Sequence, residues 1–399
     1  MLDARELLSV VAGTRELNRK RMIIEIMIKP DRQSRIAKRL GLSPASLSTA
    51  VQELIEAGIV DSGESDRSRG RGGNVRLKPM RGLAVGIDIG FRRIAVIARK
   101  VDGPPLQVYV QRREDGVSRG WRHIKPIVGQ LIRDVVDEAG QQMPDIVSAG
   151  VAVPRMFDPR TGQFATPVLP PWNDGDEPRR ELAEQLGVRV AIDNDANLGA
   201  MAEQIYGFDE PVENLVYIKA STGVGAGIMH GDKLLRGECG IAGEIGHLTV
   251  DRDGEVCLCG GRGCLDVVVG ADALLAQVRQ TRKGMMYDLP DSLGSLINKA
   301  HAGDAMCARV LNDAGRNLGF ALAQLCNIVN PRVVVLGGEL AAARELVLDP
   351  CRHELRRFAL AGALNDARFE LRPSGLSALA EAQGALILGL RLRQLDQAG

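Results

Sequence analysis

A short cysteine-rich loop after Gly243 constrains the fold of this chain more than any other segment. The loop reads GEIGHLTVDRDGEVCLCGGRGCLD and places three cysteines within eight positions, with a histidine ten residues before the first. This spacing can bring three thiolates around one ion, and tetrahedral zinc accepts three sulfurs and an imidazole. The alternative is a loop whose cysteines are neighbours without a metal. We expect a Zn2+ site formed by His247, Cys257, Cys259 and Cys264.

Length, charge and hydropathy limit the class of protein. With 399 residues, 45% of them hydrophobic, the chain can form two or three domains that each bury a core. The net charge of +1 is uneven, because residues 1–79 hold 15 lysines and arginines against 10 acidic residues. A basic amino-terminal module predicts an anionic partner. Without a long apolar run or a signal-peptide pattern, we expect a cytoplasmic protein that has no membrane span.

Residues 14–57 have the pattern of three helices joined by short turns. The expected helices span about residues 14–28, 31–40 and 44–57. Ser43 followed by Pro44 is typical of a helix start, since serine caps the first amides and proline suits the first helical position. The third helix has an apolar face, and its polar face carries Ser46, Ser48, Thr49 and Gln52. Small polar groups on an exposed helix face suit the reading of base edges in the DNA major groove.

A polar, arginine-rich run follows the third helix. It reads DSGESDRSRGRGGNVRLKP, and Val75-Arg76-Leu77 within it has the pattern of a strand. Arginines among glycines in a hairpin suit contacts with phosphates or the minor groove. The expected DNA-binding residues here are Arg67, Arg69, Arg71 and Arg76. Taken in this order, the segments predict a winged helix-turn-helix domain over residues 1–79; the simpler alternatives are a helix bundle and a solvated linker.

From Leu83 onward, buried strands alternate with amphipathic helices. LAVGIDIG opens a strand, glycine turn and second strand, and LVYIKASTGVGAGIM repeats this arrangement. This second arrangement covers residues 215–229. A helix is expected over residues 121–138, strands are expected over residues 148–154 and 333–338, and residues 188–197 are expected to form a strand that runs into a polar turn. The repeat predicts two α/β lobes within residues 80–399. Two such lobes enclose a cleft, which is the usual place for a small-molecule site.

Two turns carry candidate ligand groups. Asp193-Asn194-Asp195 follows a strand, where adjacent polar groups can bind sugar hydroxyls and one carboxylate can act as a base. The turn at residues 222–225 can offer backbone amides to phosphate, and Asp88 can hold magnesium through water. The alternative for Asp193-Asn194-Asp195 is an Asx turn or a helix cap. The alternative for the turn at residues 222–225 is a simple connection between strands, which is the role of most glycine turns.

Together these motifs resemble the ROK family of repressors, open reading frames and sugar kinases, in its repressor branch. The resemblance covers nearly the whole chain, through the winged module and GIDIG, GVAVP, IDNDAN, STGVGAGI and NPRVVVLGG. Its most specific part is GEIGH combined with CxCGxxGCL. The resemblance implies an α/β fold with a winged helical amino-terminal module. The remainder would be a two-lobed actin/hexokinase-like (ribonuclease H-like) domain with a sugar between its lobes.

The resemblance also implies particular site residues. By matching positions, the residues that contact the sugar would be Asn194, Asp195, Glu244, His247 and Asp266, and the zinc ligands would be His247 and the three loop cysteines. Asp195 matches the base of the family's kinases. Arg155 stands where the family usually has glycine, and its guanidinium would suit a phosphosugar or sugar acid. The alternative for Arg155 is a salt bridge with Asp158 or a side chain turned to solvent.

Other departures from the family pattern bear on activity. Phe91 and Arg92 replace a glycine and a threonine at the first phosphate turn, and Phe91 adds bulk where backbone must approach phosphate. Glu339 replaces a glycine at the late turn, where its charge would repel a nucleotide. Asp266 stands where glutamate is usual. The first two departures predict that the chain does not use ATP and is not an enzyme.

We therefore predict a DNA-binding transcriptional regulator, a repressor, whose operator binding is controlled by a sugar or phosphosugar effector. Helix-turn-helix proteins usually read two half-sites as dimers, so we expect a homodimer or homotetramer on double-stranded operator DNA. One alternative is an active ATP-dependent sugar kinase with a fused DNA-binding module. Another is a regulator that has lost its small ligand and responds to a protein partner.

Overall fold

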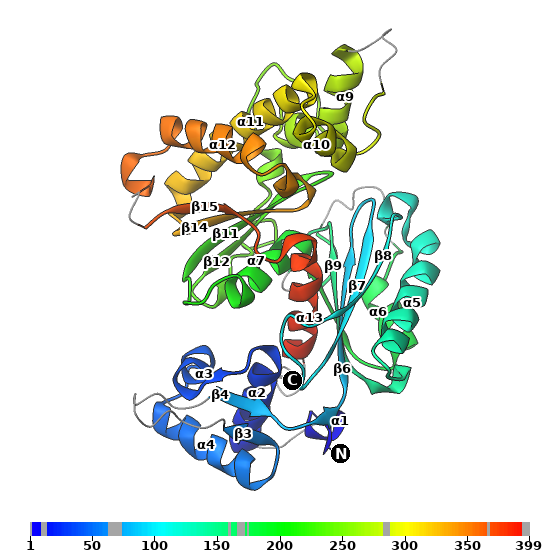
Figure 1. Cartoon of the computed structure of the whole chain (residues 1–399), viewed down its shortest axis with the longest axis vertical. Helices are drawn as coiled ribbons and strands as arrows, with labels where there is room; N and C mark the ends of the chain where they lie inside the picture. Colours follow the sequence, from blue (N-terminus) through cyan, green and yellow to red (C-terminus); the bar gives the residue numbers. More distant parts are fainter. Residues whose placement is uncertain are drawn as a thin grey trace. The chain divides into compact units, whose positions relative to one another are not determined.

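Two compact units make up the chain in the computed structural model. The structure describes residues 2–8, 14–62, 74–158, 161–165, 172–173, 175–281, 288–364 and 368–392. The first unit combines Met1–Pro154, Pro167–Asp193 and Ala382–Gly399. The second unit combines Arg155–Thr166 and Asn194–Glu381. Because the chain passes repeatedly from one unit to the other, both units are discontinuous in sequence (Figure 1).

The amino-terminal module has the predicted helices and a small sheet. The helices are α2 (Thr14–Ile28), α3 (Gln33–Leu40) and α4 (Pro44–Glu56). The sheet has the order β2-β4-β3, formed by β2 (Asp31–Arg32), β4 (Asn74–Leu77) and β3 (Val60–Ser62). Helix α3 begins later than expected, because Asp31 and Arg32 pair with β4 instead. Ser43 caps α4 as predicted, since its hydroxyl accepts a hydrogen bond from the Ser46 amide at 3.1 Å.

Two short elements connect this module to the rest of the first unit. Strand β1 (Leu2–Asp3) pairs in parallel with β5 (Met80–Arg81), and α1 (Ala4–Leu7) follows β1. The Asp3 side chain accepts a hydrogen bond from the Arg5 amide and so caps α1. The predicted domain boundary after residue 79 thus falls at a paired strand inside the first unit.

The larger sheet of the first unit has the order β10-β9-β6-β7-β8. Its strands are β6 (Leu83–Ile89), β7 (Ile94–Lys100), β8 (Tyr109–Arg113), β9 (Ile146–Val153) and β10 (Val190–Asn194). Strands β6 and β7 form the predicted antiparallel pair, and β9 runs parallel to β6. Helices α5 (Trp121–Glu138) and α6 (Pro178–Leu186) cover one face, while α13 (Ala380–Leu392) covers the opposite face (Figure 1).

Helix α13 lies directly on the backbone of this sheet. A Cβ atom at Gly86 of β6 would lie 2.1 Å from the Ala382 carbonyl oxygen. A Cβ atom at Gly150 of β9 would lie 1.9 Å from the Ala385 carbonyl oxygen. Glycine inside a strand often marks such a close approach of another backbone. The two glycines therefore fix where α13 rests.

The second unit repeats the design around a sheet of order β13-β12-β11-β14-β15. Its strands are β11 (Asn214–Ala220), β12 (Val224–His230), β13 (Lys233–Leu234), β14 (Val333–Gly337) and β15 (Glu370–Pro373). Its helices are α7 (Asp195–Tyr206), α8 (Asp266–Val269), α9 (Ala271–Thr281), α10 (Leu293–His301), α11 (Ala305–Val329) and α12 (Glu345–Phe358). Helix α7 lies on one face of the sheet, and α11 and α12 lie on the other (Figure 1).

The antiparallel pair of β11 and β12 matches that of β6 and β7, so the predicted internal repeat and fold class are confirmed. None of the helices in the described part of the chain is both long enough and apolar enough to cross a membrane.

Candidate functional site

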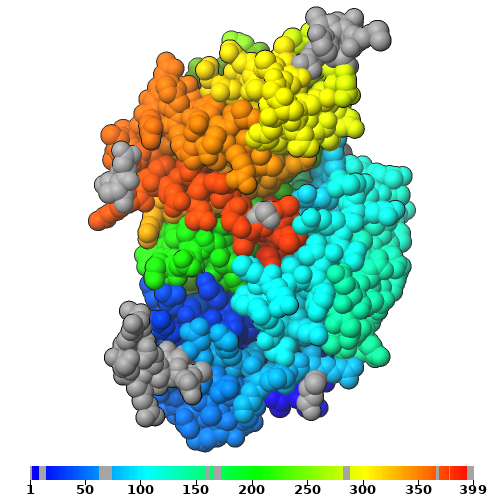
Figure 2. Space-filling view, viewed as in Figure 1, coloured from blue at the N-terminus to red at the C-terminus, as the bar shows by residue number. Residues whose placement is uncertain are grey.

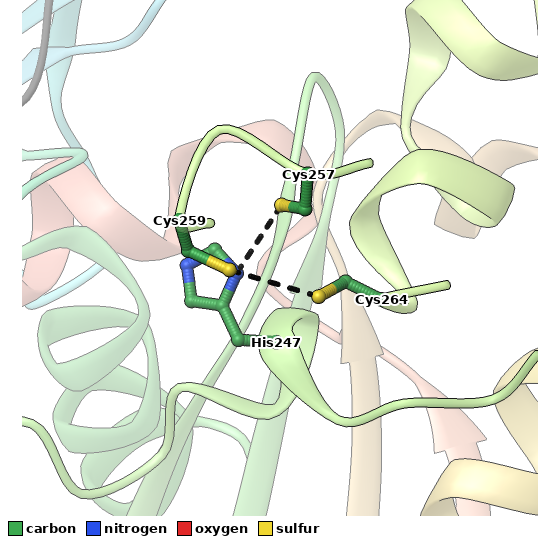
Figure 3. A group of neighbouring side chains, drawn as sticks. All are labelled: His247, Cys257, Cys259 and Cys264. Carbon is green, nitrogen blue, oxygen red and sulfur yellow. Dashed lines mark hydrogen bonds between the residues drawn. The ribbon is translucent and has the colours of Figure 1, made fainter. Parts of the chain in front are cut away.

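The four predicted metal ligands converge in the second unit. His247 ends the short helix η4 (Ile245–His247), and the three cysteines lie in the loop that follows. Their ligand atoms all lie within 4.8 Å of one another, and the four side chains point toward one centre (Figure 3). The Cys259 and Cys264 sulfurs are 3.7 Å apart, as are the Cys257 sulfur and Nδ1 of His247. Ligand atoms of tetrahedral zinc lie about 3.8 Å apart when the Zn–S distance is about 2.3 Å.

Two thiols of this cluster, Cys259 and Cys264, have pKa values that are shifted in opposite directions. The Gly261 amide donates a hydrogen bond to the Cys259 sulfur at 3.4 Å and lowers the pKa of that thiol. Burial raises the pKa of Cys264 to about 12. Metal coordination requires deprotonated cysteines, so a bound cation would stabilise the Cys264 thiolate that burial otherwise opposes.

His247 connects this cluster to a group of carboxylates. Its Nδ1 faces Cys257, while its Nε2 lies 3.9 Å from a carboxylate oxygen of Glu244. Burial raises the pKa of Glu244 to about 7, and the negative charges of Asp195 and Asp266 add to this rise. Burial also raises the pKa of Asp266, whereas the Val224 amide and His247 lower it. Asp195, Glu244, His247 and Asp266 thus form one electrostatically coupled group.

Local backbone contacts hold these carboxylates in place. The Asp266 carboxylate accepts a hydrogen bond from the Val224 amide at 2.7 Å, at the start of β12. A Cβ atom at Gly246 would lie 2.3 Å from the same carboxylate, so only glycine permits this approach. Asn194 caps α7, because its side chain accepts a hydrogen bond from the Asn197 amide at 3.1 Å. The helix-cap alternative for Asn194 is therefore correct, although capping leaves its side chain beside Asp195.

The structure adds a residue that sequence reasoning missed. The Lys219 ammonium lies 2.5 Å from the Asp195 carboxylate, and their side chains are only 14% and 8% exposed. Lys219 interrupts the otherwise apolar strand β11. A lone lysine in a buried strand requires a counter-charge. The sequence could therefore have indicated that Lys219 pairs with an acidic residue. The carboxylate at the predicted base position is therefore paired with a cation.

Arg155 belongs to the same part of the second unit. It is buried, with 6% exposure, so the alternative of a solvent-facing side chain is wrong. Its Nη2 donates a hydrogen bond to the Ala165 carbonyl oxygen at 3.2 Å. Its positive charge opposes the rise in the Glu244 pKa, and burial lowers its own pKa. Arg155 thus places a positive charge near the group of acidic side chains that includes Glu244.

The two turns that would approach a nucleotide are occupied by local contacts. The Phe91 carbonyl oxygen accepts a hydrogen bond from the Ser118 amide at 2.9 Å, and the Val117 amide donates to Gly90. In the second unit, the Glu339 amide donates to the Ser221 hydroxyl at 2.9 Å. The glutamate thereby occupies the turn that follows Gly338.

The predicted recognition helix presents its polar face to solvent. Ser46, Ser48, Thr49 and Gln52 are all exposed on α4, opposite the buried Leu47, Val51 and Leu54. The Gln52 side chain donates a hydrogen bond to Glu56 at 3.1 Å. Arg76 is exposed on wing strand β4, whereas Arg67, Arg69 and Arg71 lie outside the described residues.

Comparison with models of protein families shows which family the chain belongs to. The ROK family model matches residues 84–391, which is most of the chain. The chain belongs to the ROK family. A winged helix-turn-helix DNA-binding model matches residues 32–61, which include α3 and α4. The family resemblance and the winged module predicted from the sequence are confirmed.

Relatives of this ROK protein include both repressors and kinases. It is 29% identical to the xylose repressor of Bacillus subtilis (strain 168) over 93% of this chain and 94% of that protein. It is 31% identical to a glucokinase of Halalkalibacterium halodurans over 73% of this chain and 90% of the kinase. The crystal structure of a ROK family transcriptional regulator, a homologue of the E. coli MLC protein, matches its fold with a TM-score of 0.70. That match has 22% identity and covers 96% of this chain and 99% of the other.

Proposed function

We propose that this ROK protein is a DNA-binding transcriptional repressor whose operator binding is controlled by a sugar or sugar derivative. The observation that carries the proposal is the winged helix-turn-helix in the same chain as a group of carboxylates, a histidine, the buried Arg155 and the partly buried Lys219. Carboxylates and imidazoles are suited to hydrogen bonding with sugar hydroxyls. The residues that would bind the effector are Asn194, Asp195, Glu244, His247, Asp266 and Arg155.

The proposed effector site is not catalytic. A general base must be free to accept a proton from the attacking hydroxyl. Both oxygens of the Asp195 carboxylate already have partners, because Oδ2 is paired with the Lys219 ammonium and Oδ1 accepts a hydrogen bond from the Ala196 amide. Phosphoryl transfer also depends on positioning of the nucleotide phosphates, and the Gly90–Phe91 and Gly338–Glu339 turns already make local contacts. These features support a role for Asp195 as a hydrogen-bond acceptor.

We also propose that His247, Cys257, Cys259 and Cys264 bind a structural zinc ion. The donor set and the separations of its atoms fit tetrahedral coordination. Nδ1 of His247 would bind the metal, which leaves Nε2 directed toward Glu244. A metal-bound imidazole is fixed in tautomer and orientation, so the ion would hold this ring in place for the effector.

The proposed domain division is a DNA-binding domain over residues 1–79 and a sugar-binding domain over residues 80–399. Helix α4 would enter the major groove, and Arg76 and the arginines at 67, 69 and 71 would contact the backbone or minor groove. Because such modules read paired half-sites, a homodimer or homotetramer is proposed. Operator binding implies a cytoplasmic location.

The proposed DNA contacts predict two different effects of mutation. Arg76→Ala should weaken binding to all sequences and lower the salt slope of log K by about one unit, because it removes a phosphate contact. Gln52→Ala should change the preferred sequence, at about 1–3 kcal/mol for the affected base pair. Selection from a random DNA pool, followed by salt titrations, measures both effects. Unchanged affinity and salt slope in Arg76→Ala would remove Arg76 from the interface.

The effector class is tested by calorimetry with neutral sugars and their phosphates. D-xylose and D-glucose are the natural first probes, since they correspond to the names of the relatives. We expect the phosphorylated sugar to bind more tightly by about tenfold, because a charge-assisted hydrogen bond to Arg155 contributes about 1.5–3 kcal/mol. Arg155→Gly should abolish this difference. Tighter binding of the neutral sugar by the wild-type protein would exclude an anionic effector.

The second candidate function is an ATP-dependent sugar kinase with a fused DNA-binding module. It is favoured by the carboxylate at the base position and by the similarity to a glucokinase. An assay of ADP release with magnesium, ATP and each sugar distinguishes the candidates. Robust turnover would establish the kinase, whereas sugar-dependent DNA binding without turnover would establish the repressor.

A further inference from the structure

A completely buried arginine lies between the DNA-binding module and the first large sheet. Arg99, near the end of β7, has 0% exposure. Its guanidinium donates hydrogen bonds to the Met27 carbonyl oxygen at 2.6 Å and to the Ile28 carbonyl oxygen at 3.3 Å. These carbonyls end helix α2, which has no basic residue in its own last turn. Arg99 thus supplies the cation that the negative end of α2 favours.

A second, partly buried contact joins the same helix to α13. The Glu25 side chain on α2 is 5% exposed and forms an ion pair with Arg391 at 3.3 Å. Arg39 of α3 lies at 3.3 Å from the other oxygen of Glu25 and at 2.9 Å from Asp31. One carboxylate therefore holds α2, α3 and α13 together. A buried charge that loses its partner is strongly destabilising, so this group resists separation.

The two arginines that make these contacts, Arg99 and Arg391, lie on regular secondary structure of the first unit. Arg99 lies on a strand paired on both sides, and its Nη1 also donates to the Pro105 carbonyl oxygen at 3.1 Å. Arg391 lies on α13, whose backbone rests against Gly86 and Gly150. On the face drawn in Figure 2, the blue surface of the module meets the cyan surface of the first unit directly. The module is therefore attached at two points, each supported by regular secondary structure.

We propose that Arg99 and Arg391 are positioning residues that dock the DNA-binding module on the first unit as one rigid body. The orientation of α4 then follows every movement of that unit. Control by an effector acts by reorienting a docked module, and does not act by releasing a flexible one. This inference rests on the proposed function for its regulatory part, while the docking itself does not depend on any effector.

The test uses the full-length protein carrying Arg391→Gln or Arg99→Lys. Arg133→Gln is the matched control, because Arg133 is exposed on α5 and donates a hydrogen bond to Gln130 of the same helix at 2.7 Å. Hydrogen exchange is measured for the amides of α2 and α3. DNA affinity is measured with and without D-xylose and D-glucose, on a sequence that the wild-type protein selects from a random pool.

We expect exchange in the last turn of α2 to rise about tenfold in both variants and to stay unchanged in Arg133→Gln. DNA affinity without sugar should stay within about threefold of the wild type, while the sugar-dependent change in affinity is lost. If the two arginines only stabilised the fold, DNA affinity without sugar and its response to sugar would fall together.

Unchanged exchange in Arg391→Gln would overturn the docking. Faster exchange together with a full sugar response would overturn the positioning role. If the wild-type protein responds to neither sugar, the proposed effector control fails for these sugars, and the exchange data still decide the docking. Should Arg99→Lys fail to fold, Arg391→Gln decides alone, since its side chain is 30% exposed.

Discussion

Cys259→Ser is expected to lose zinc and sugar binding together. Cys259 is exposed, so its replacement removes a metal ligand without opening a cavity in the core. Without the ion, His247 is no longer held toward Glu244, and loss of such orientation typically weakens a site by about 10–100-fold. Zinc content is measured by atomic absorption after dialysis, and sugar affinity by calorimetry.

Cys239→Ser is the control for this experiment. Cys239 is also exposed but lies outside the metal cluster, so zinc content and sugar affinity should match those of the wild type. A zinc-free Cys259→Ser protein that binds sugar with wild-type affinity would disconnect the metal from the effector site.

Asp195→Asn is expected to weaken sugar binding by up to about 100-fold, since a hydrogen bond between a charged carboxylate and a sugar hydroxyl contributes about 1.5–3 kcal/mol. The same change leaves the Lys219 ammonium buried without its carboxylate. The free energy of unfolding should therefore fall by about 3 kcal/mol. Urea denaturation and calorimetry measure the two effects separately.

A double variant separates the stability effect from the binding effect. Adding Lys219→Met to Asp195→Asn removes the unpaired cation and should restore most of the stability, while sugar binding stays weak. Asp232→Asn, in the exposed turn between β12 and β13, is the control for carboxylate loss. Sugar affinity that survives in Asp195→Asn would remove Asp195 from the effector site.

The features that could be predicted from the sequence are formed by residues that lie close together in the sequence. The clustering of His247 with the cysteines was predictable because the three cysteines lie in one short loop, so their spacing alone brings the sulfurs together. The recognition helix was predictable from its serine cap and from the period of its apolar face. Each signal is contained within a single helix or a single loop.

The features that escaped prediction are contacts between distant segments. Lys219 resembles a residue in an ordinary strand until α7 places Asp195 beside it. Arg99 stands near the end of β7, where a charged residue usually faces solvent, yet the end of α2 covers it completely. Glycine at positions 86 and 150 inside strands could have indicated the close approach of another backbone, but nothing in their spacing identifies α13 as the partner.

The position of α13 also determines when the first unit can finish folding during synthesis. Helix α13 covers a sheet whose strand β9 ends at Val153, so the first unit must wait for a segment made much later. At about 5–20 residues per second, this wait lasts roughly ten to fifty seconds on the ribosome. Meanwhile the metal loop and its carboxylates, which lie between Asn194 and Glu381, have already emerged. A chain interrupted before Arg391 would therefore have the cysteine loop of the second unit but would lack the ion pair between Glu25 and α13, so assembly of the first unit depends on translation through α13.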